Sequence, residues 1–190
     1  MKKRFLKGAA CAAMMVLSVG VFGCDSNEKT AEKPPTVQET KEVAPPPAPV
    51  VKSDDDIVAD AVKGTLDYHS NSLCKYKTSK ANTSAETVIV ELSAEAGWDY
   101  KSTVEAYNDT AKYIFASIYQ SQLSYPIENV NISFYTTLTN SKTGAESEER
   151  IYSIGLTGEA AKNLHWDKID KVDITLSANG VYIHPSLKNM

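Results

Sequence analysis

The histidines and nearby carboxylates are the first residues in this sequence that could support catalysis or metal binding. The chain has three histidines, which are His69, His165 and His184. No HxH, HxxxH or CxxC pattern occurs, so the common zinc-binding spacings are absent. The region His165–Asp173 combines one histidine with three aspartates, and a carboxylate–histidine site could form there. A solvated loop around Trp166 is the simpler interpretation, and we expect neither a metal nor a cofactor.

Cys74 is the second candidate for chemistry, as a nucleophilic thiol. A thiol becomes reactive when neighbouring cations lower its pKa, and Lys75 and Lys77 are close in sequence. Leu73 and Tyr76 lie equally close and could bury the thiol instead. A lone cysteine is more often a small buried residue, so we favour a structural role. No GxSxG elbow, SxxK motif or glycine-rich phosphate loop accompanies it.

The third candidate is a set of aromatic side chains suited to binding rather than catalysis. All ten tyrosines lie between residues 53 and 190, and several follow one predicted helix. Tyrosine and tryptophan bury large areas at low entropic cost and are common in interfaces. Tyr107, Tyr113, Tyr119 and Trp166 are therefore predicted binding residues. The alternative is that the tyrosines line the edge of the core.

A cationic start and an apolar stretch open the chain. Residues 1–7 carry four basic residues and no acid, and residues 8–23 are uncharged and rich in Ala, Met, Val and Leu. This apolar stretch of about 16 residues is shorter than the roughly 20 that a spanning helix needs. It suits the hydrophobic region of a secretory signal peptide, which we assign to residues 1–23.

The stretch ends at Val21-Phe22-Gly23-Cys24, which resembles the lipobox of bacterial lipoproteins. The resemblance covers residues 1–24 and implies that Cys24 is acylated and becomes the first residue of the mature chain. Two or more acyl chains hold a protein stably to a bilayer. The resemblance thus implies a lipid anchor on the extracytoplasmic side of a membrane, in the cell envelope. An ordinary signal peptide or an uncleaved N-terminal anchor is the alternative.

Residues 24–52 differ in composition from the rest of the chain. Six of the eight prolines lie between Pro34 and Pro49, and no aromatic residue occurs there. Such a segment cannot bury enough apolar surface to offset its ordering entropy. The composition predicts a disordered, partly polyproline II tether between the anchor and a single domain, residues 53–190. A Pro-rich ligand for a partner domain is the alternative function of this segment.

The charge of the mature chain argues against nucleic acid as a partner. The formal net charge of the whole sequence is −4, and residues 1–23 contribute four positive charges to it. The mature form is therefore at −8. Nucleic acid binding depends on Lys and Arg side chains that neutralise phosphates. We expect the anchor, and not the surface of the domain, to hold the protein at the membrane.

Apolar periodicity predicts the elements that position these residues. Helices are indicated from the triple Asp at 54–56 to residue 66, from Ser102 until Pro126, and over 159–164 with Thr157 as the cap. Strands are indicated at 87–92, 172–176 and 181–183, the last two joined by Asn179-Gly180. The pattern of residues 129–156 predicts an antiparallel hairpin with a polar turn over 140–148.

This order of elements predicts an α+β fold, with a mainly antiparallel sheet and helices packed on one face. The segment Thr157–Asp167 and the closing His184-Pro185 also resemble features of small bacterial envelope and prophage-associated domains of unknown function. The resemblance covers roughly residues 105–187 and implies no activity.

The expected function is that of a membrane-anchored, non-enzymatic module that binds a partner protein or a cell-wall component. The tether, the acidic surface and the lack of catalytic motifs favour it. The alternative is a small envelope hydrolase or thiol enzyme that uses Cys74 or the region His165–Asp173.

Overall fold

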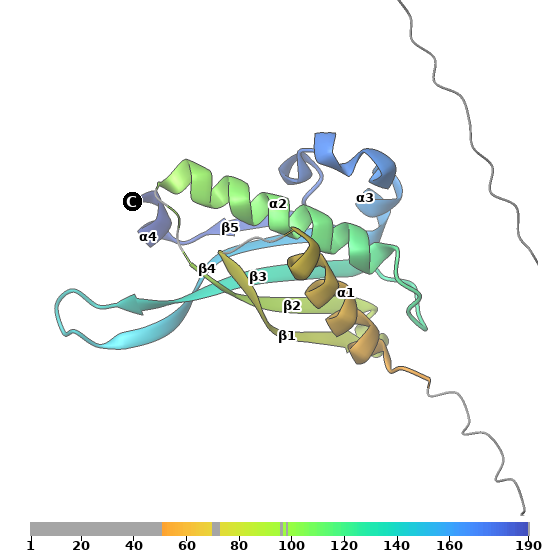
Figure 1. Cartoon of the computed structure of the whole chain (residues 1–190), viewed down its shortest axis with the longest axis horizontal. Helices are drawn as coiled ribbons and strands as arrows, with labels where there is room; N and C mark the ends of the chain where they lie inside the picture. Colours follow the sequence, from red (N-terminus) through yellow and green to blue (C-terminus); the bar gives the residue numbers. More distant parts are fainter. Residues whose placement is uncertain (1–50, 70–72, 96, 98, 190) are drawn as a thin grey trace, which may run out of the picture. The chain divides into compact units, whose positions relative to one another are not determined.

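The computed structural model describes residues 51–69, 73–95, 97 and 99–189, and Figure 1 shows their arrangement. They belong to one compact unit, Ala48–Met190. Residues 1–50, which include Cys24 and all but the last two residues of the Pro-rich segment, lie outside the described residues, so the signal peptide, lipid anchor and tether stay predictions. Within the described part of the chain, no helix is both long and apolar enough to cross a bilayer.

A five-stranded sheet forms the centre of the fold, with its strands in chain order. The strands are β1 (Cys74–Asn82), β2 (Thr87–Ala94), β3 (Asn129–Thr139), β4 (Glu146–Thr157) and β5 (Gly180–Ile183). Neighbouring strands are antiparallel except β2 and β3. Those two are parallel because helix α2 (Tyr100–Tyr119) carries the chain back along the sheet between them.

The helices complete an α+β fold. Helix α1 (Asp54–His69) and α2 lie side by side on one face of the sheet (Figure 1). The remaining described helices are α3 (Gly158–Lys162), α4 (Pro185–Lys188) and the 3₁₀ helices Thr83–Ala85, Trp166–Lys171 and Ile174–Leu176. The predicted class, a mainly antiparallel sheet with helices packed on one face, is confirmed.

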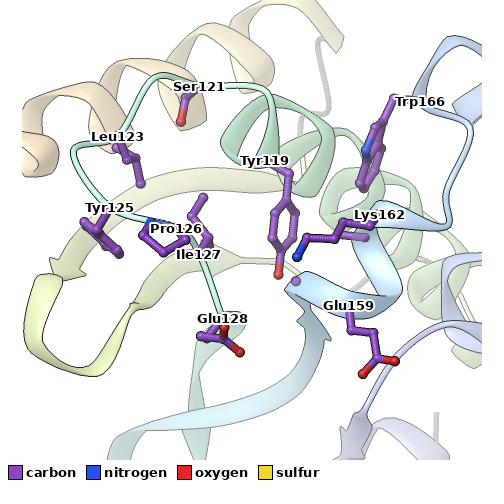
Figure 2. Close-up of a pocket in the computed structure, with 12 residues that line it drawn as sticks. Tyr119, Ser121, Leu123, Tyr125, Pro126, Ile127, Glu128, Glu159, Lys162 and Trp166 are labelled. Carbon is purple, nitrogen blue, oxygen red and sulfur yellow. The ribbon is translucent and has the colours of Figure 1, made fainter.

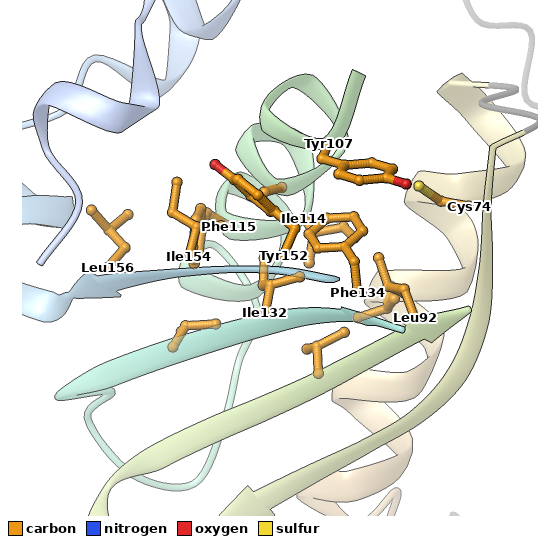
Figure 3. Packing of buried hydrophobic residues seen from close by; sticks show 14 of the residues in the cluster. Cys74, Leu92, Tyr107, Ile114, Phe115, Ile132, Phe134, Tyr152, Ile154 and Leu156 are labelled. Carbon is orange, nitrogen blue, oxygen red and sulfur yellow. The ribbon is translucent and has the colours of Figure 1, made fainter. Parts of the chain in front are cut away.

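The core lies between the sheet and α1 and α2. In β2 every second side chain, from Val88 to Ala94, is buried, as expected for a strand with one covered face. Ile89 lies on the other face of β2 and is 44% exposed. Tyr107 and Phe115 of α2 are fully buried, and the Tyr107 ring stacks on Phe134 with centroids 4.8 Å apart (Figure 3).

The predicted hairpin over residues 129–156 is confirmed as β3 and β4. The register shifts between Phe134 and Tyr135, because Tyr152 pairs with Phe134 while Arg150 pairs with Tyr135. Ile151 is thus the extra residue of a bulge. This bulge allows Ile151 and Tyr152, which are consecutive, both to be fully buried. The turn is shorter than predicted, because β3 extends to Thr139 and β4 begins at Glu146.

The acidic start of α1 does more than suit the helix dipole. The Asp54 carboxylate accepts hydrogen bonds from the backbone N–H (2.9 Å) and the hydroxyl of Ser124. The Asp55 carboxylate accepts one from the backbone N–H of Ala81, at 2.6 Å. Two of the three acids therefore attach α1 to segments that are distant in sequence.

The bounds of α2 differ from the sequence prediction. The helix begins at Tyr100, and the Asp99 carboxylate caps it by accepting from the backbone N–H of Ser102 at 3.0 Å. Ser102 is therefore inside the helix and not its cap. The helix ends at Tyr119, well before Pro126, and the Ser121 hydroxyl donates to the Ile118 carbonyl at 2.6 Å. Residues 120–128 form a loop as a result.

Two strand predictions were also wrong or incomplete. Residues 172–176 are not a strand, because Asp173 caps the 3₁₀ helix Ile174–Leu176 instead. The segment after Asn179-Gly180 does form a strand, β5, but it pairs with β4. Strand β1 was missed because its sequence, CKYKTSKAN, lacks a clear apolar alternation.

Candidate functional site

The main candidate site is a pocket at the end of the sheet where β3 begins and β4 ends (Figure 2). Its volume is about 590 Å³, within the roughly 300–1,000 Å³ typical of ligand sites. One wall is the loop 120–128, and the other is α3 with Trp166. The lining residues are Tyr119, Ser121, Leu123, Tyr125, Pro126, Ile127, Glu128, Gly158, Glu159, Ala161, Lys162 and Trp166.

Hydrogen bonds from three directions hold the loop wall in place. Ser124 is bonded to the Asp54 carboxylate at the start of α1. The Tyr125 hydroxyl donates to the carbonyl of Thr87 in β2 at 3.2 Å. The backbone N–H of Glu128 donates to the carbonyl of Glu86 at 2.7 Å. The loop is therefore fixed to α1 and to the sheet, and the pocket does not depend on a ligand to form it.

The contact between the two walls requires a glycine at position 158. The backbone N–H of Gly158 donates to the Glu128 carbonyl at 2.9 Å. A Cβ at Gly158 would lie 2.2 Å from the carbonyl oxygen of Ile127. The Thr157 hydroxyl accepts from the backbone N–H of Ala160 at 3.2 Å and so caps α3, which confirms the predicted cap.

Two stacked aromatic rings form the flat side of the pocket. The rings of Tyr119 and Trp166 have centroids 6.1 Å apart and planes 20° apart. The Tyr119 hydroxyl donates to the Leu156 carbonyl at 2.5 Å, which fixes the ring. Burial raises the pKa of Tyr119 above its ordinary value, so this hydroxyl stays a donor. Both side chains are half-buried, so part of each ring is open to the pocket.

Three charged side chains surround the opening. Glu128, Glu159 and Lys162 are exposed, and none of them forms an ion pair with another residue that the structure describes. Glu159 and Lys162 project from the same short helix, with Lys162 directed toward Tyr119 (Figure 2). The pocket therefore offers two acceptor groups and one donor beside an aromatic surface.

The structure separates the four predicted binding residues. Tyr119 and Trp166 meet in the pocket, together with Tyr125. Tyr107 is fully buried and its hydroxyl donates to the Glu95 carbonyl at 2.8 Å, so it belongs to the core and presents no binding surface. Tyr113 lies elsewhere on α2, where its ring stacks on His69 with centroids 3.6 Å apart and its hydroxyl donates to Asp170.

Cys74 has the environment of a structural thiol. It lies in the cluster of buried core residues (Figure 3). It is 4% exposed, and burial raises its pKa to about 11. The neighbouring lysines do not offset this, because Lys75 pairs with Glu95 and Lys77 pairs with Glu148. The nearby Thr110 hydroxyl lies 3.9 Å from the sulfur. A thiolate nucleophile is therefore disfavoured at neutral pH.

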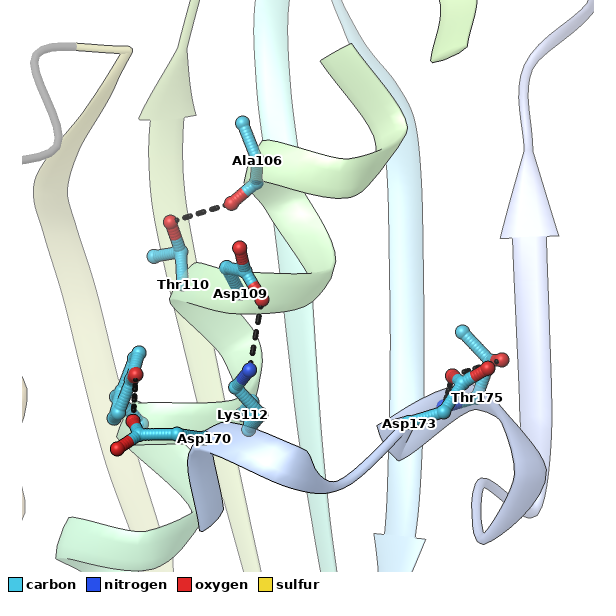
Figure 4. Close-up of polar contacts among 8 residues, drawn as sticks. Ala106, Asp109, Thr110, Lys112, Asp170, Asp173 and Thr175 are labelled. Carbon is cyan, nitrogen blue, oxygen red and sulfur yellow. Dashed lines mark hydrogen bonds and ion pairs between the residues drawn. The ribbon is translucent and has the colours of Figure 1, made fainter. Parts of the chain in front are cut away.

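Two of the three acids of the region His165–Asp173 accept hydrogen bonds from the fold itself. Asp170 accepts from the Tyr113 hydroxyl, and Asp173 accepts from the backbone N–H of Thr175 at 3.0 Å (Figure 4). His165 is exposed. Across from them, the buried Lys112 amine lies 2.8 Å from the Asp109 carboxylate. Among the described residues, no group of three or more His, Cys, Asp or Glu side chains is arranged to hold a metal ion.

Comparison with known protein families, curated proteins and solved structures found no match for this chain. The pocket is therefore interpreted from its own residues. Sequence reasoning missed Glu128, Glu159 and Lys162, although a signal existed. The predicted hairpin places the residues before 129 opposite those after 156, so the loop before β3 and the turn after β4 had to meet.

Proposed function

We propose that this chain is a lipid-anchored envelope lipoprotein whose domain is a non-enzymatic binding module, and that the pocket is its binding site. Acylated Cys24 is the proposed anchor, and residues 25–52 are the proposed spacer. The observation that supports the binding role is the composition of the pocket. The Tyr119 and Trp166 rings line it beside charged side chains that have no ion-pair partner among the described residues. The proposed location is the extracytoplasmic side of a membrane, and the proposed partner is a protein or a cell-wall component.

The geometry supports binding better than catalysis. The pocket holds no pair of a nucleophile and a base in hydrogen-bond contact among its described residues, and its aromatic wall suits recognition of a flat surface. Cys74, the candidate thiol, is buried in the core and its pKa is raised. The enzyme alternative therefore has no observation that favours it.

The first experiment is a crosslinked capture from envelopes with the full-length chain, tagged after Met190. A Cys24→Ala chain from which residues 1–23 have been cleaved should leave the membrane fraction, because it lacks the residue that is acylated. Trp166→Ala should reduce the captured partner or wall material by about tenfold, which corresponds to the loss of roughly 1.4 kcal/mol of aromatic contact.

Tyr182→Ala is the matched control, because Tyr182 is an exposed tyrosine (38%) of β5 and does not line the pocket. It should capture as much as the unmodified chain. Equal loss in both variants, or capture that does not depend on Trp166, would exclude the pocket as the binding site. Membrane retention of a Cys24→Ala chain from which residues 1–23 have been cleaved would exclude the lipid anchor.

A further inference from the structure

The charges at the pocket restrict the kind of ligand that fits it. A strongly anionic ligand would meet the carboxylates of Glu128 and Glu159, and a strongly cationic one would meet the Lys162 amine. These three groups are exposed and form no ion pairs with other described residues, so they are free to accept or donate hydrogen bonds. A neutral ligand that carries both donors and acceptors can satisfy all three groups together.

The shape of the pocket favours a ring over an extended peptide. Peptides that add to a sheet are held by the free backbone edge of a strand. The lining residues come from the end of α2, the loop 120–128, α3 and Trp166, and none of them lies within a strand. A ligand is thus held by side chains. The Tyr119 and Trp166 rings contact each other and leave part of their surface open to the pocket, and the electron-rich face of an aromatic ring attracts the C–H groups of a saturated ring.

The opposite wall adds an apolar contact. Leu123, Pro126 and Ile127 of the loop line the pocket across from the aromatic pair (Figure 2). A small apolar substituent on a polar ring, such as the methyl of an acetamide, can be buried there. The acetamide N–H and carbonyl would meet the carboxylates and the Lys162 amine, respectively.

We infer that the pocket binds the pyranose rings of a neutral, N-acetylated amino-sugar polymer. This inference rests on the proposed binding function and narrows its partner from a protein or wall component to a glycan. One ring lies against Tyr119 and Trp166, its acetamide methyl contacts the loop wall, and Glu128, Glu159 and Lys162 bond its polar groups.

Titration calorimetry of the full mature chain in detergent, with defined tetrasaccharides, tests the inference. The probes are β-1,4-linked tetramers of N-acetylglucosamine, of glucose and of unacetylated glucosamine. We expect the N-acetylated tetramer to bind at least tenfold more tightly than the other two, which lack the acetamide or carry positive charge. Tighter binding of the unacetylated, cationic tetramer would overturn the inference.

Variants connect the binding to the pocket. Trp166→Ala should lower the affinity for the N-acetylated tetramer by about tenfold, and Lys162→Gln should lower it by about threefold. Tyr182→Ala should leave this affinity unchanged. Trp166→Phe keeps a ring in place and should recover most of the affinity, which separates a lost contact from a lost fold. Unchanged affinity in Trp166→Ala would contradict the assigned position of the sugar.

The outcome also separates this inference from the proposed function. Trp166-dependent capture from envelopes without binding of any tetrasaccharide would leave the binding module standing and overturn the glycan as its ligand. If capture from envelopes does not depend on Trp166 and no tetrasaccharide binds, both proposals are overturned.

Discussion

At the scale of single residues, two glycines show how much the pocket depends on close backbone contact. Gly158 brings α3 against the loop 120–128, and a Cβ there would lie 2.2 Å from a backbone oxygen that cannot move aside without moving the loop. Gly64 lies on the exposed side of α1, and a Cβ there would meet nothing within 4 Å. Replacing each glycine with alanine should therefore change the free energy of unfolding in opposite directions.

Gly158→Ala should lower the free energy of unfolding by about 2 kcal/mol, in the range of other overpacking changes. Gly64→Ala should raise it by about 0.8 kcal/mol, because alanine is the better residue in the interior of an exposed helix. Urea unfolding of both variants beside the unmodified chain measures the difference. Equal stabilities of the two variants would show that the walls of the pocket are not in close contact.

The residues of the pocket were only partly predictable from the sequence. Tyr119 and Trp166 could be proposed because aromatic side chains on a helix and in a loop are candidates for binding. Tyr107 could not be separated from them, because its position in the sequence, 12 positions before Tyr119, gives no direct measure of burial. Only the packing of α2 on the sheet shows that Tyr107 stacks on Phe134 while Tyr119 reaches Leu156.

At the scale of elements, α1 acts as a support for the loop 120–128. The Asp54 carboxylate receives two hydrogen bonds from Ser124, and 70 residues of sequence separate the partners. Asp56 is equally near the start of α1, but its carboxylate accepts only from the Ser53 hydroxyl among the described side chains, at 2.7 Å. The two acids make similar contributions to the helix dipole and differ in their contact with the loop.

Asp54→Ala should lower the free energy of unfolding by about 1.5 kcal/mol, the size expected for hydrogen bonds to a charged group. It should also speed hydrogen exchange at the amides of residues 121–125. Asp56→Ala is the control and should cost about 0.5 kcal/mol without changing exchange in the loop. Similar exchange in the two variants would mean that Asp54 does not hold the loop.

The elements themselves were predicted unevenly, for physical reasons. Strand β2 was found because its first residues are β-branched, and the β3–β4 hairpin was found because apolar and polar side chains alternate along the start of β3. Strand β1 is at the edge of the sheet and carries Lys75, Lys77 and Lys80, which protect an edge from unwanted pairing and hide the apolar pattern. Residues 172–176 were assigned as a strand because Val172 and Ile174 alternate, but Asp173 stabilises a 3₁₀ turn there.

At the scale of the whole molecule, the buried hydroxyls and the thiol make stability sensitive to alkali. Burial raises the pKa of Cys74 to about 11 and raises the pKa values of Tyr107, Tyr119 and Tyr152 still further. The folded chain keeps these protons at a pH where the unfolded chain has lost them. The stability they contribute is therefore complete below pH 9 and is lost as the pH rises through the folded pKa values.

We expect the free energy of unfolding to fall steadily above about pH 9, and to fall less steeply in Tyr152→Phe, which has one fewer buried group to titrate. At pH 7 the same variant should be less stable by about 1 kcal/mol, because it loses the hydrogen bond to Asn108. Urea unfolding at intervals from pH 7 to 11 measures both effects. A stability that stays constant up to pH 11 would contradict the burial of these groups.

The β3–β4 hairpin extends past its neighbours. Strand β2 pairs with β3 only as far as Tyr135, and β5 pairs with β4 only as far as Tyr152. Beyond these residues the hairpin has no further strand beside it in the described part of the chain. It can therefore fray without disturbing the core, so proteases should cut first near residues 140–145. The pocket lies at the opposite end of the same two strands. An epitope or fluorescent label inserted at this tip would therefore report on the protein without covering the pocket.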